Sequence, residues 1–202
     1  MDNEAAPRIG DVELASLVRR FPDARVLVLG DVMLDRYVSG SASRLSPEAP
    51  IPVLRPSSSW ATLGGAANVA MNVATLGGHV ALVGVIGDDA AGAEVARLLA
   101  TLPGMVPHLV VSPGRPTTAK TRFLVGVHQL LRLDEEITAA VDQTTSATLL
   151  ARFAEALQTA DVVVLSDYAK GVLTDDVLHA AIARAAAAAS IGAVLSSSSR
   201  SS

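Results

Sequence analysis

Two adjacent glycines, Gly64 and Gly65, precede a helix-like run of residues that contains Asn68. Glycine lacks a Cβ atom and tolerates positive φ, so the bare backbone can approach a ligand closely at this point. A helix N-terminus also presents unpaired N–H groups, and the Asn68 amide can both donate and accept hydrogen bonds. This combination suits a polyhydroxylated ligand, although a glycine pair before a helix is more often a simple turn.

Two carboxylates, Asp31 and Asp35, follow the apolar residues 25–30. That segment is short, rich in valine and leucine, and ends in glycine, which is typical of a buried parallel strand. Ligands of open α/β sheets bind beyond the C-terminal ends of such strands. A carboxylate there can accept hydrogen bonds from sugar hydroxyls. The alternative for Asp31 is that it caps a turn or a helix.

Three cations lie in residues 117–133, where alternating residues predict a strand hairpin. Lys120 and Arg122 share parity, so they lie on one face of a strand, where two cations can hold a phosphate. A solvated strand face is the alternative. Arg132 is a further possible phosphate contact. Residues 114–121 imitate a phosphate-binding loop, but Ala119 replaces the second glycine, and a strand follows where the motif requires a helix.

Asp167 and Lys170 follow a second buried strand, predicted at residues 161–166. They therefore lie at the ligand edge of the same sheet. Both can contact a substrate or a magnesium-bound phosphate, or they can pair with each other and order the loop. The chemistry of the two side chains favours neither interpretation.

Strand and helix patterns alternate along the chain, which predicts an α/β fold with a mainly parallel sheet. We expect an N-terminal extension or leading helix within residues 1–23, an α/β domain over 24–195 and a disordered serine-rich tail over 196–202. The proline-rich residues 37–63 read as a lid, with an edge strand at 51–54. Further strands are predicted at 80–86 and 109–112, and helices at 68–76, 90–102, 146–157 and 175–189. A cap is expected from residues 87–89 for the helix that begins near residue 90, and from Thr174 for the last helix.

Composition excludes several classes of protein. The chain has 202 residues, no cysteine and a net charge of −4, so neither a disulfide framework nor a nucleic-acid partner is expected. No apolar run reaches the about 18 residues that a membrane span needs. The four histidines lack metal-ligand spacing, so no resident metal site is predicted. We expect a soluble cytoplasmic protein that has no membrane partner.

The pattern Gly-Gly-Ala-Ala-Asn-x-Ala at 64–70, followed by Gly77 and Gly87, resembles the first signature of the ribokinase or PfkB family of sugar kinases. Residues 30–37, 44–53, 132–134 and 165–171 resemble the heptose 7-phosphate kinases of that family, which occur alone or as half of a bifunctional kinase/adenylyltransferase. The resemblance extends over about residues 24–189. It implies a Rossmann-like ribokinase fold with a small β lid, and a homodimer formed through that lid.

The resemblance also implies a reaction. These kinases use ATP and Mg²⁺ to phosphorylate the anomeric hydroxyl of D-glycero-β-D-manno-heptose 7-phosphate, on the route to ADP-heptose for the lipopolysaccharide core. It places Asp35, Gly64, Gly65 and Asn68 at the sugar, and Lys120 and Arg122 near the 7-phosphate.

One family feature is missing from the sequence. Kinases of this family share a late Gly-Ala-Gly-Asp motif, whose helix N-terminus stabilises the transferring phosphoryl group and whose aspartate is the catalytic base. No such motif occurs in these 202 residues. We therefore expect a truncated kinase that lacks a catalytic aspartate and turnover. The alternatives are a non-catalytic sugar-phosphate-binding or dimerising module, and a kinase of the same family for another sugar, such as a fructose phosphate or ribose.

Overall fold

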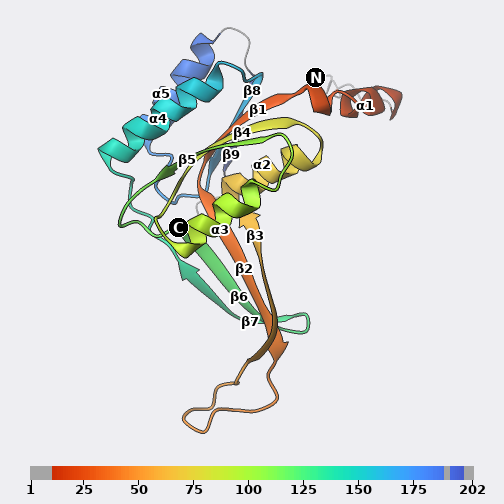
Figure 1. Cartoon of the computed structure of the whole chain (residues 1–202), viewed down its shortest axis with the longest axis vertical. Helices are drawn as coiled ribbons and strands as arrows, with labels where there is room; N and C mark the ends of the chain where they lie inside the picture. The colour runs from red at the N-terminus through yellow and green to blue at the C-terminus, as the bar shows by residue number, and fades with distance from the viewer. Residues whose placement is uncertain (1–10, 189–191, 198–202) are drawn as a thin grey trace, which may run out of the picture.

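The computed structural model describes residues 11–188 and 192–197 (Figure 1). Its body is built on a five-stranded sheet, sheet A, with strand order β5-β4-β1-β8-β9. Every pairing in sheet A is parallel. The strands are β1 (Arg25–Gly30), β4 (His79–Ile86), β5 (Met105–Val111), β8 (Val162–Asp167) and β9 (Gly192–Ser197).

Helices cover both faces of sheet A, which is why its central strands are apolar on both sides. One core cluster joins alternate strand residues such as Leu27 and Leu29 to Phe153 of α4 and Ala181 of α5. The other joins Val28 to residues of α2 and α3. The helices are α1 (Asp11–Val18), the 3-10 turn Phe21–Asp23, α2 (Gly65–Thr75), α3 (Ala90–Leu99), α4 (Gln143–Leu157) and α5 (Asp175–Ala187). None of these described helices is both long and apolar enough to cross a membrane.

A second sheet, sheet B, projects from the body as an arm (Figure 1). Its order is β3-β2-β6-β7, from β2 (Val32–Ser41), β3 (Arg55–Gly64), β6 (Thr118–Val125) and β7 (His128–Glu135). Strands β2 and β6 run parallel, whereas the two outer pairs are antiparallel. The predicted α/β class with a small additional β element is thus confirmed, as is the hairpin of β6 and β7.

Several predicted boundaries are wrong. The strand predicted at 109–112 begins at Met105, and the helices predicted from residues 68 and 146 begin at Gly65 and Gln143. Residues 51–54 form no strand, and Pro52 makes only a single bridge with Leu45. The strand begins instead at Arg55 and tolerates Pro56 because β3 lies at a sheet edge. The disordered tail was predicted to start at Ser196, yet β9 continues to Ser197. Strand pairing uses backbone groups that serine possesses like any other residue; residues 198–202 lie outside the described part.

The predicted helix caps are confirmed. The Asp89 carboxylate accepts a hydrogen bond from the Gly92 N–H at the start of α3, at 2.7 Å. The Thr174 hydroxyl accepts one from the Val177 N–H at the start of α5, at 3.3 Å. These caps satisfy N–H groups that a helix leaves unpaired at its first turn.

Candidate functional site

The register of sheet B gathers the predicted site residues on one face of the arm, here called the site face. Cross-strand partners lie on the same face of a sheet. The inner row across the four strands is Thr62, Asp35, Lys120 and Asp134, and the outer row is Trp60, Tyr37, Arg122 and Arg132. Asp35, Lys120, Arg122 and Arg132, which the sequence singled out separately, are therefore neighbours.

Charged groups on the site face are paired with one another. Arg122 Nη1 donates to Asp35 Oδ1 at 2.5 Å, and this hydrogen bond raises the pKa of Arg122 against the effect of burial. Lys120 Nζ lies 3.1 Å from Asp134 Oδ2 and 3.0 Å from Glu136 Oε2. An anionic ligand must therefore compete with carboxylates for these cations.

Two further cations complete this charge cluster. Arg132 makes a two-pronged contact with Asp134, at 2.8 and 2.9 Å, and Lys170 Nζ lies 2.8 Å from Glu136 Oε1. The cluster comprises four cations, Lys120, Arg122, Arg132 and Lys170, and three carboxylates, Asp35, Asp134 and Glu136. It therefore has a formal charge of +1, which suits a substrate that carries a phosphate.

Aromatic side chains support the outer row. The rings of Tyr37 and Trp60 stack with centroids 5.1 Å apart and an interplanar angle of 6°. The Arg122 guanidinium lies 5.3 Å from the Tyr37 ring centroid, within the range of a cation–π contact. The stack fixes Arg122 from the side opposite β7. The sequence analysis missed this role for Tyr37 and Trp60 because it depends on the strand register.

The two glycines lie where the arm meets the body, at the end of β3 and the start of α2. A Cβ on Gly64 would lie 2.6 Å from Asp35 Oδ2, so only glycine leaves that carboxylate open. Gly65 has a φ of 55°, and its Cβ would overlap the Asp31 carbonyl oxygen. Asn68 follows in the first turn of α2. One of the first N–H groups of α2 is not free for a ligand, because the Ala66 N–H donates to the Asp31 carbonyl at 2.8 Å.

Asp31 does not lie on the site face. Its side chain is 1% exposed and accepts hydrogen bonds from the backbone N–H groups of Tyr168, Lys170 and Val172 at 2.7, 3.2 and 3.3 Å. Burial raises the pKa of Asp31, and these hydrogen bonds oppose that shift. The contacts support the capping alternative for this residue.

Lys170 and Asp167 lie on the loop after β8 but take different partners. Lys170 reaches the charge cluster through Glu136. Asp167 Oδ1 accepts a hydrogen bond from the Ala169 N–H at 2.7 Å, within its own loop. Glu136, which bridges Lys120 and Lys170, was not predicted. The sequence does hold a clue, because residues 132, 134 and 136 alternate and therefore fall on the same face of β7 and its extension.

Glu136 gives the site a pH dependence. Burial raises the pKa of Glu136, but hydrogen bonds from Lys170 and Lys120 outweigh burial and hold the pKa below its ordinary value. A lowered folded-state pKa means that the stabilisation is complete above the unfolded pKa, about 4.3, and is lost as pH falls through the folded pKa. Between pH 6 and pH 3 the free energy of unfolding should fall for both proteins. In urea unfolding, the fall for Glu136→Gln should be about 1 kcal/mol smaller than the fall for wild type. Parallel curves for the two proteins would contradict this role.

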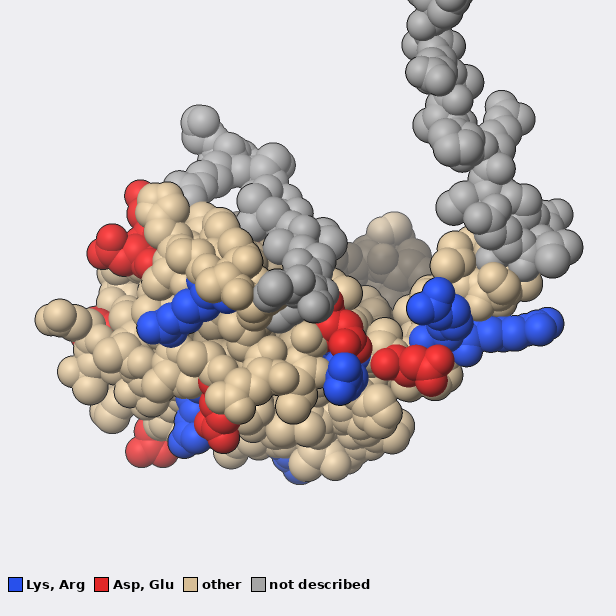
Figure 2. Space-filling model, turned by 90° about the horizontal axis from the view of Figure 1, so that it is seen from above, with Lys and Arg blue, Asp and Glu red and all other residues tan. Residues whose placement is uncertain are grey.

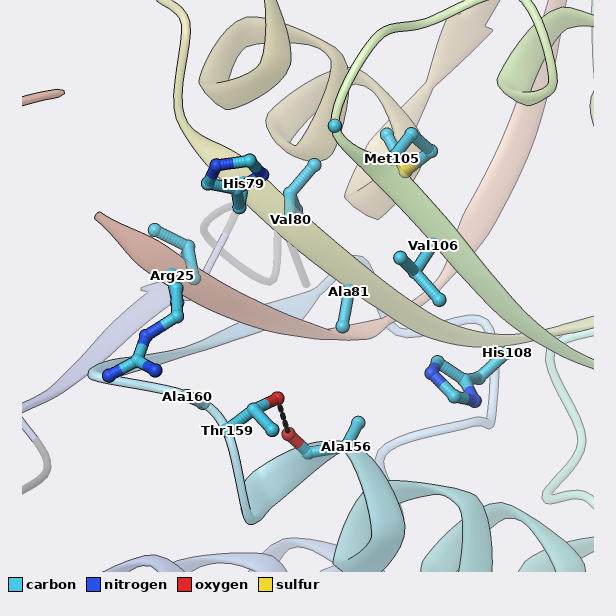
Figure 3. Close-up of a pocket in the computed structure, with 12 residues that line it drawn as sticks. Arg25, His79, Val80, Ala81, Met105, Val106, His108, Ala156, Thr159 and Ala160 are labelled. Atoms are coloured by element: carbon cyan, nitrogen blue, oxygen red, sulfur yellow. Dashed lines mark hydrogen bonds between the residues drawn. The ribbon is translucent and has the colours of Figure 1, made fainter. Parts of the chain in front are cut away.

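Other surfaces offer less chemistry. A cavity of about 440 Å³ lies at the end of sheet A where β1, β4 and β5 begin, and it is lined by Arg25, His79, Val106, His108 and Thr159 among others (Figure 3). It contains none of the predicted site residues. On the surface seen from above, basic and acidic side chains are interspersed and form no continuous patch (Figure 2). Within the described residues, no group of three or more His, Cys, Asp or Glu side chains is placed to hold a metal ion.

Comparison with known proteins identifies similar chains. Residues 23–202 match the family described as pfkB family carbohydrate kinase. A bifunctional protein HldE from Caulobacter sp. (strain K31) is 54% identical over 178 residues, which cover 88% of this chain and 36% of that protein. The HldE of Caulobacter vibrioides is 51% identical over the same length, with the same coverage of both chains. The chain thus spans about a third of the length of these curated relatives.

Solved structures agree on the fold. A possible 1-phosphofructokinase from Thermotoga maritima superposes with a TM-score of 0.65 at 17% identity, over 87% of this chain and 54% of the other. At that identity the likeness concerns the fold alone.

Proposed function

Because this chain belongs to the pfkB family of carbohydrate kinases, we propose that its site face binds a phosphorylated sugar. The proposed reaction of the intact protein is transfer of the ATP γ-phosphate to the anomeric hydroxyl of D-glycero-β-D-manno-heptose 7-phosphate, in ADP-heptose and lipopolysaccharide core synthesis. The segments at 44–53 and 165–171 support this sugar over others. The 54% identity to a bifunctional HldE protein supports a sugar kinase of this pathway.

The observation that carries the proposal is the position of Asp35. Its carboxylate lies beside the bare backbone of Gly64 and is held by Arg122. Asp35 accepts hydrogen bonds from sugar hydroxyls, and Gly65 and Asn68 follow Gly64 in the first turn of α2. The outer row lies two residues further along each strand, about 7 Å away. A sugar ring at Asp35 can therefore extend its phosphate toward Arg122 and Arg132 in the outer row, with Lys120 directly beside Asp35.

Catalysis of phosphoryl transfer rests on positioning and charge stabilisation. In this proposal Asp35 orients the accepting sugar, the charge cluster holds its phosphate, and the arm excludes water that would compete as acceptor. Family membership implies ATP and Mg²⁺, with Mg²⁺ neutralising phosphate charge when bound. Within the part of the chain that the structure describes, no cluster of three or more His, Cys, Asp or Glu side chains forms a ready-made metal site, and the sequence has no Gly-Ala-Gly-Asp motif. We therefore expect these residues to bind the substrate without turnover.

The other face of the arm supports a homodimer. Leu131 and Leu133 lie on the face opposite the site face, 58% and 48% exposed. Exposed apolar side chains on neighbouring positions favour pairing with a second copy. We propose that two arms associate through this face in a cytoplasmic enzyme. Light scattering of a Leu131→Asp variant, which should be monomeric, tests it against a dimeric wild type.

The test of function is calorimetric binding of heptose 7-phosphate to the purified chain, followed by an ATP-dependent phosphorylation assay with Mg²⁺. Binding without turnover is the expected result. Turnover would show that the catalytic base and nucleotide site lie within these residues. Absence of binding to heptose 7-phosphate, together with binding of fructose phosphate or ribose, would favour a kinase for another sugar. Binding of sugar phosphates in general, with no preference for heptose 7-phosphate and no phosphorylation, would favour the binding-module alternative.

A further inference from the structure

Two loops deliver charged groups to the site without secondary structure of their own. The connection from β7 to α4 contains Glu136, and the connection from β8 to α5 contains Lys170. The ion pair between these side chains, at 2.8 Å, links the loops to the Lys120 end of the charge cluster. Its geometry depends on whatever fixes the two backbones.

Arg115 bonds to both loops at once. Its Nη1 donates to the Ala139 carbonyl at 2.9 Å, and its Nη2 donates to the Ile137 carbonyl at 2.8 Å and to the Lys170 carbonyl at 2.5 Å. The planar guanidinium presents several N–H donors in a fixed fork, whereas a lysine ammonium is a single point. Only arginine can therefore span three carbonyls on two separate segments.

The same loops are fixed from the other side. The Lys170 N–H donates to the buried Asp31 carboxylate, so the peptide groups on both sides of this residue are held. The Val141 N–H donates to the Gly171 carbonyl at 3.0 Å. Gly171 has a φ of 79°, and a Cβ there would overlap the Ala139 carbonyl oxygen. The loops are thus packed backbone against backbone, with Arg115 closing the contact.

We infer that Arg115 is a positioning residue for sugar-phosphate binding, acting by holding Lys170 and Glu136 in register with Lys120. The inference rests on the proposed function, because Lys170 matters only if the charge cluster binds the substrate phosphate. Arg115 itself is placed to contact backbone carbonyls, so its effect on the ligand passes through Lys170.

The test combines two measurements on the full chain: amide hydrogen exchange at Lys170 without ligand, and calorimetric Kd for heptose 7-phosphate. Arg115→Met should speed exchange at the Lys170 amide and raise Kd, each by about tenfold. Arg115→Lys keeps charge and stem and should recover only part of either loss. Arg184→Met is the matched control, since Arg184 also donates to a backbone carbonyl, that of Leu150 at 2.7 Å, away from the site.

A double variant separates positioning from general stability. If Arg115 acts through Lys170, the Arg115→Met/Lys170→Met protein should bind no more weakly than Lys170→Met alone. Losses that multiply, or Lys170 exchange no faster than in Arg184→Met, would overturn the inference. If wild type binds no sugar phosphate, the proposed function fails, while the exchange measurement still decides whether Arg115 holds the loop. Should Arg115→Met not fold, the same comparisons apply to Arg115→Lys.

Discussion

Replacing Asp35 by alanine should weaken heptose 7-phosphate binding by about 100-fold or more, because two hydrogen bonds to a charged group are worth about 3–6 kcal/mol together. The loss has two sources. The variant removes the acceptor of the sugar hydroxyls, and it frees Arg122, whose Nη1 bonds to Asp35. Calorimetric titration of the purified variant measures the effect.

Asp161→Ala is the control for this prediction. Asp161 also pairs with an arginine, Arg25, at 2.6 Å, but at the exposed end of sheet A where β1 and β8 begin. The Asp161→Ala variant should bind heptose 7-phosphate with the same Kd as wild type. Gly64→Ala provides a second check, because its methyl group would lie 2.6 Å from Asp35 Oδ2 and obstruct the carboxylate. If Asp35→Ala and Asp161→Ala bind equally well, Asp35 is not the sugar ligand.

Replacing Gly65 by alanine should lower the free energy of unfolding by about 2–4 kcal/mol. Alanine at a φ of 55° is strained, and its Cβ would overlap the Asp31 carbonyl oxygen. That carbonyl also accepts the Ala66 N–H, so a shift that relieves the overlap breaks the hydrogen bond. Urea unfolding of the variant and wild type gives the difference.

Gly114→Ala separates the two causes. Gly114 has a φ of 76°, yet a Cβ there meets no atom within 4 Å. The Gly114→Ala variant should lose only the free energy that comes from backbone strain at positive φ, about 1 kcal/mol. If both variants lose the same free energy of unfolding, the Asp31 carbonyl can move away without cost. The close contact at Gly65 then does not contribute to stability.

Much of the body could be predicted from sequence because its signals are local. Residues 26–29 are apolar at every position, as suits a strand that lies between two others, and Asp89 and Thr174 stand directly before helices. The parity of Lys120 and Arg122 likewise placed both on one strand face. Each of these inferences needs only a few adjacent residues and a known period.

The site itself depends on contacts between distant segments. The pairing of Asp35 with Arg122 joins residues 87 positions apart, and the contacts of Asp31 with the loop after β8 join residues 137 to 141 apart. No local pattern states which strands are neighbours or in what register. For this reason Glu136, Arg115 and the Tyr37–Trp60 stack emerged only with the fold, and Asp31 could not be separated from a substrate ligand beforehand.

Asp31 is the sole residue between the last residue of β1 and the first of β2, so one residue joins the body to the arm at this point. Its N–H donates to the Ser166 carbonyl, its carbonyl accepts from Ala66, and its carboxylate holds the loop after β8. A joint with every polar group engaged makes a poor hinge. The root of the arm should move with the body as one stiff unit, and bending should concentrate further out, at the register shift between Ser39 and Gly40. The sugar would then bind to the rigid base of sheet B, while the part of the arm beyond residues 39 and 40 could still move.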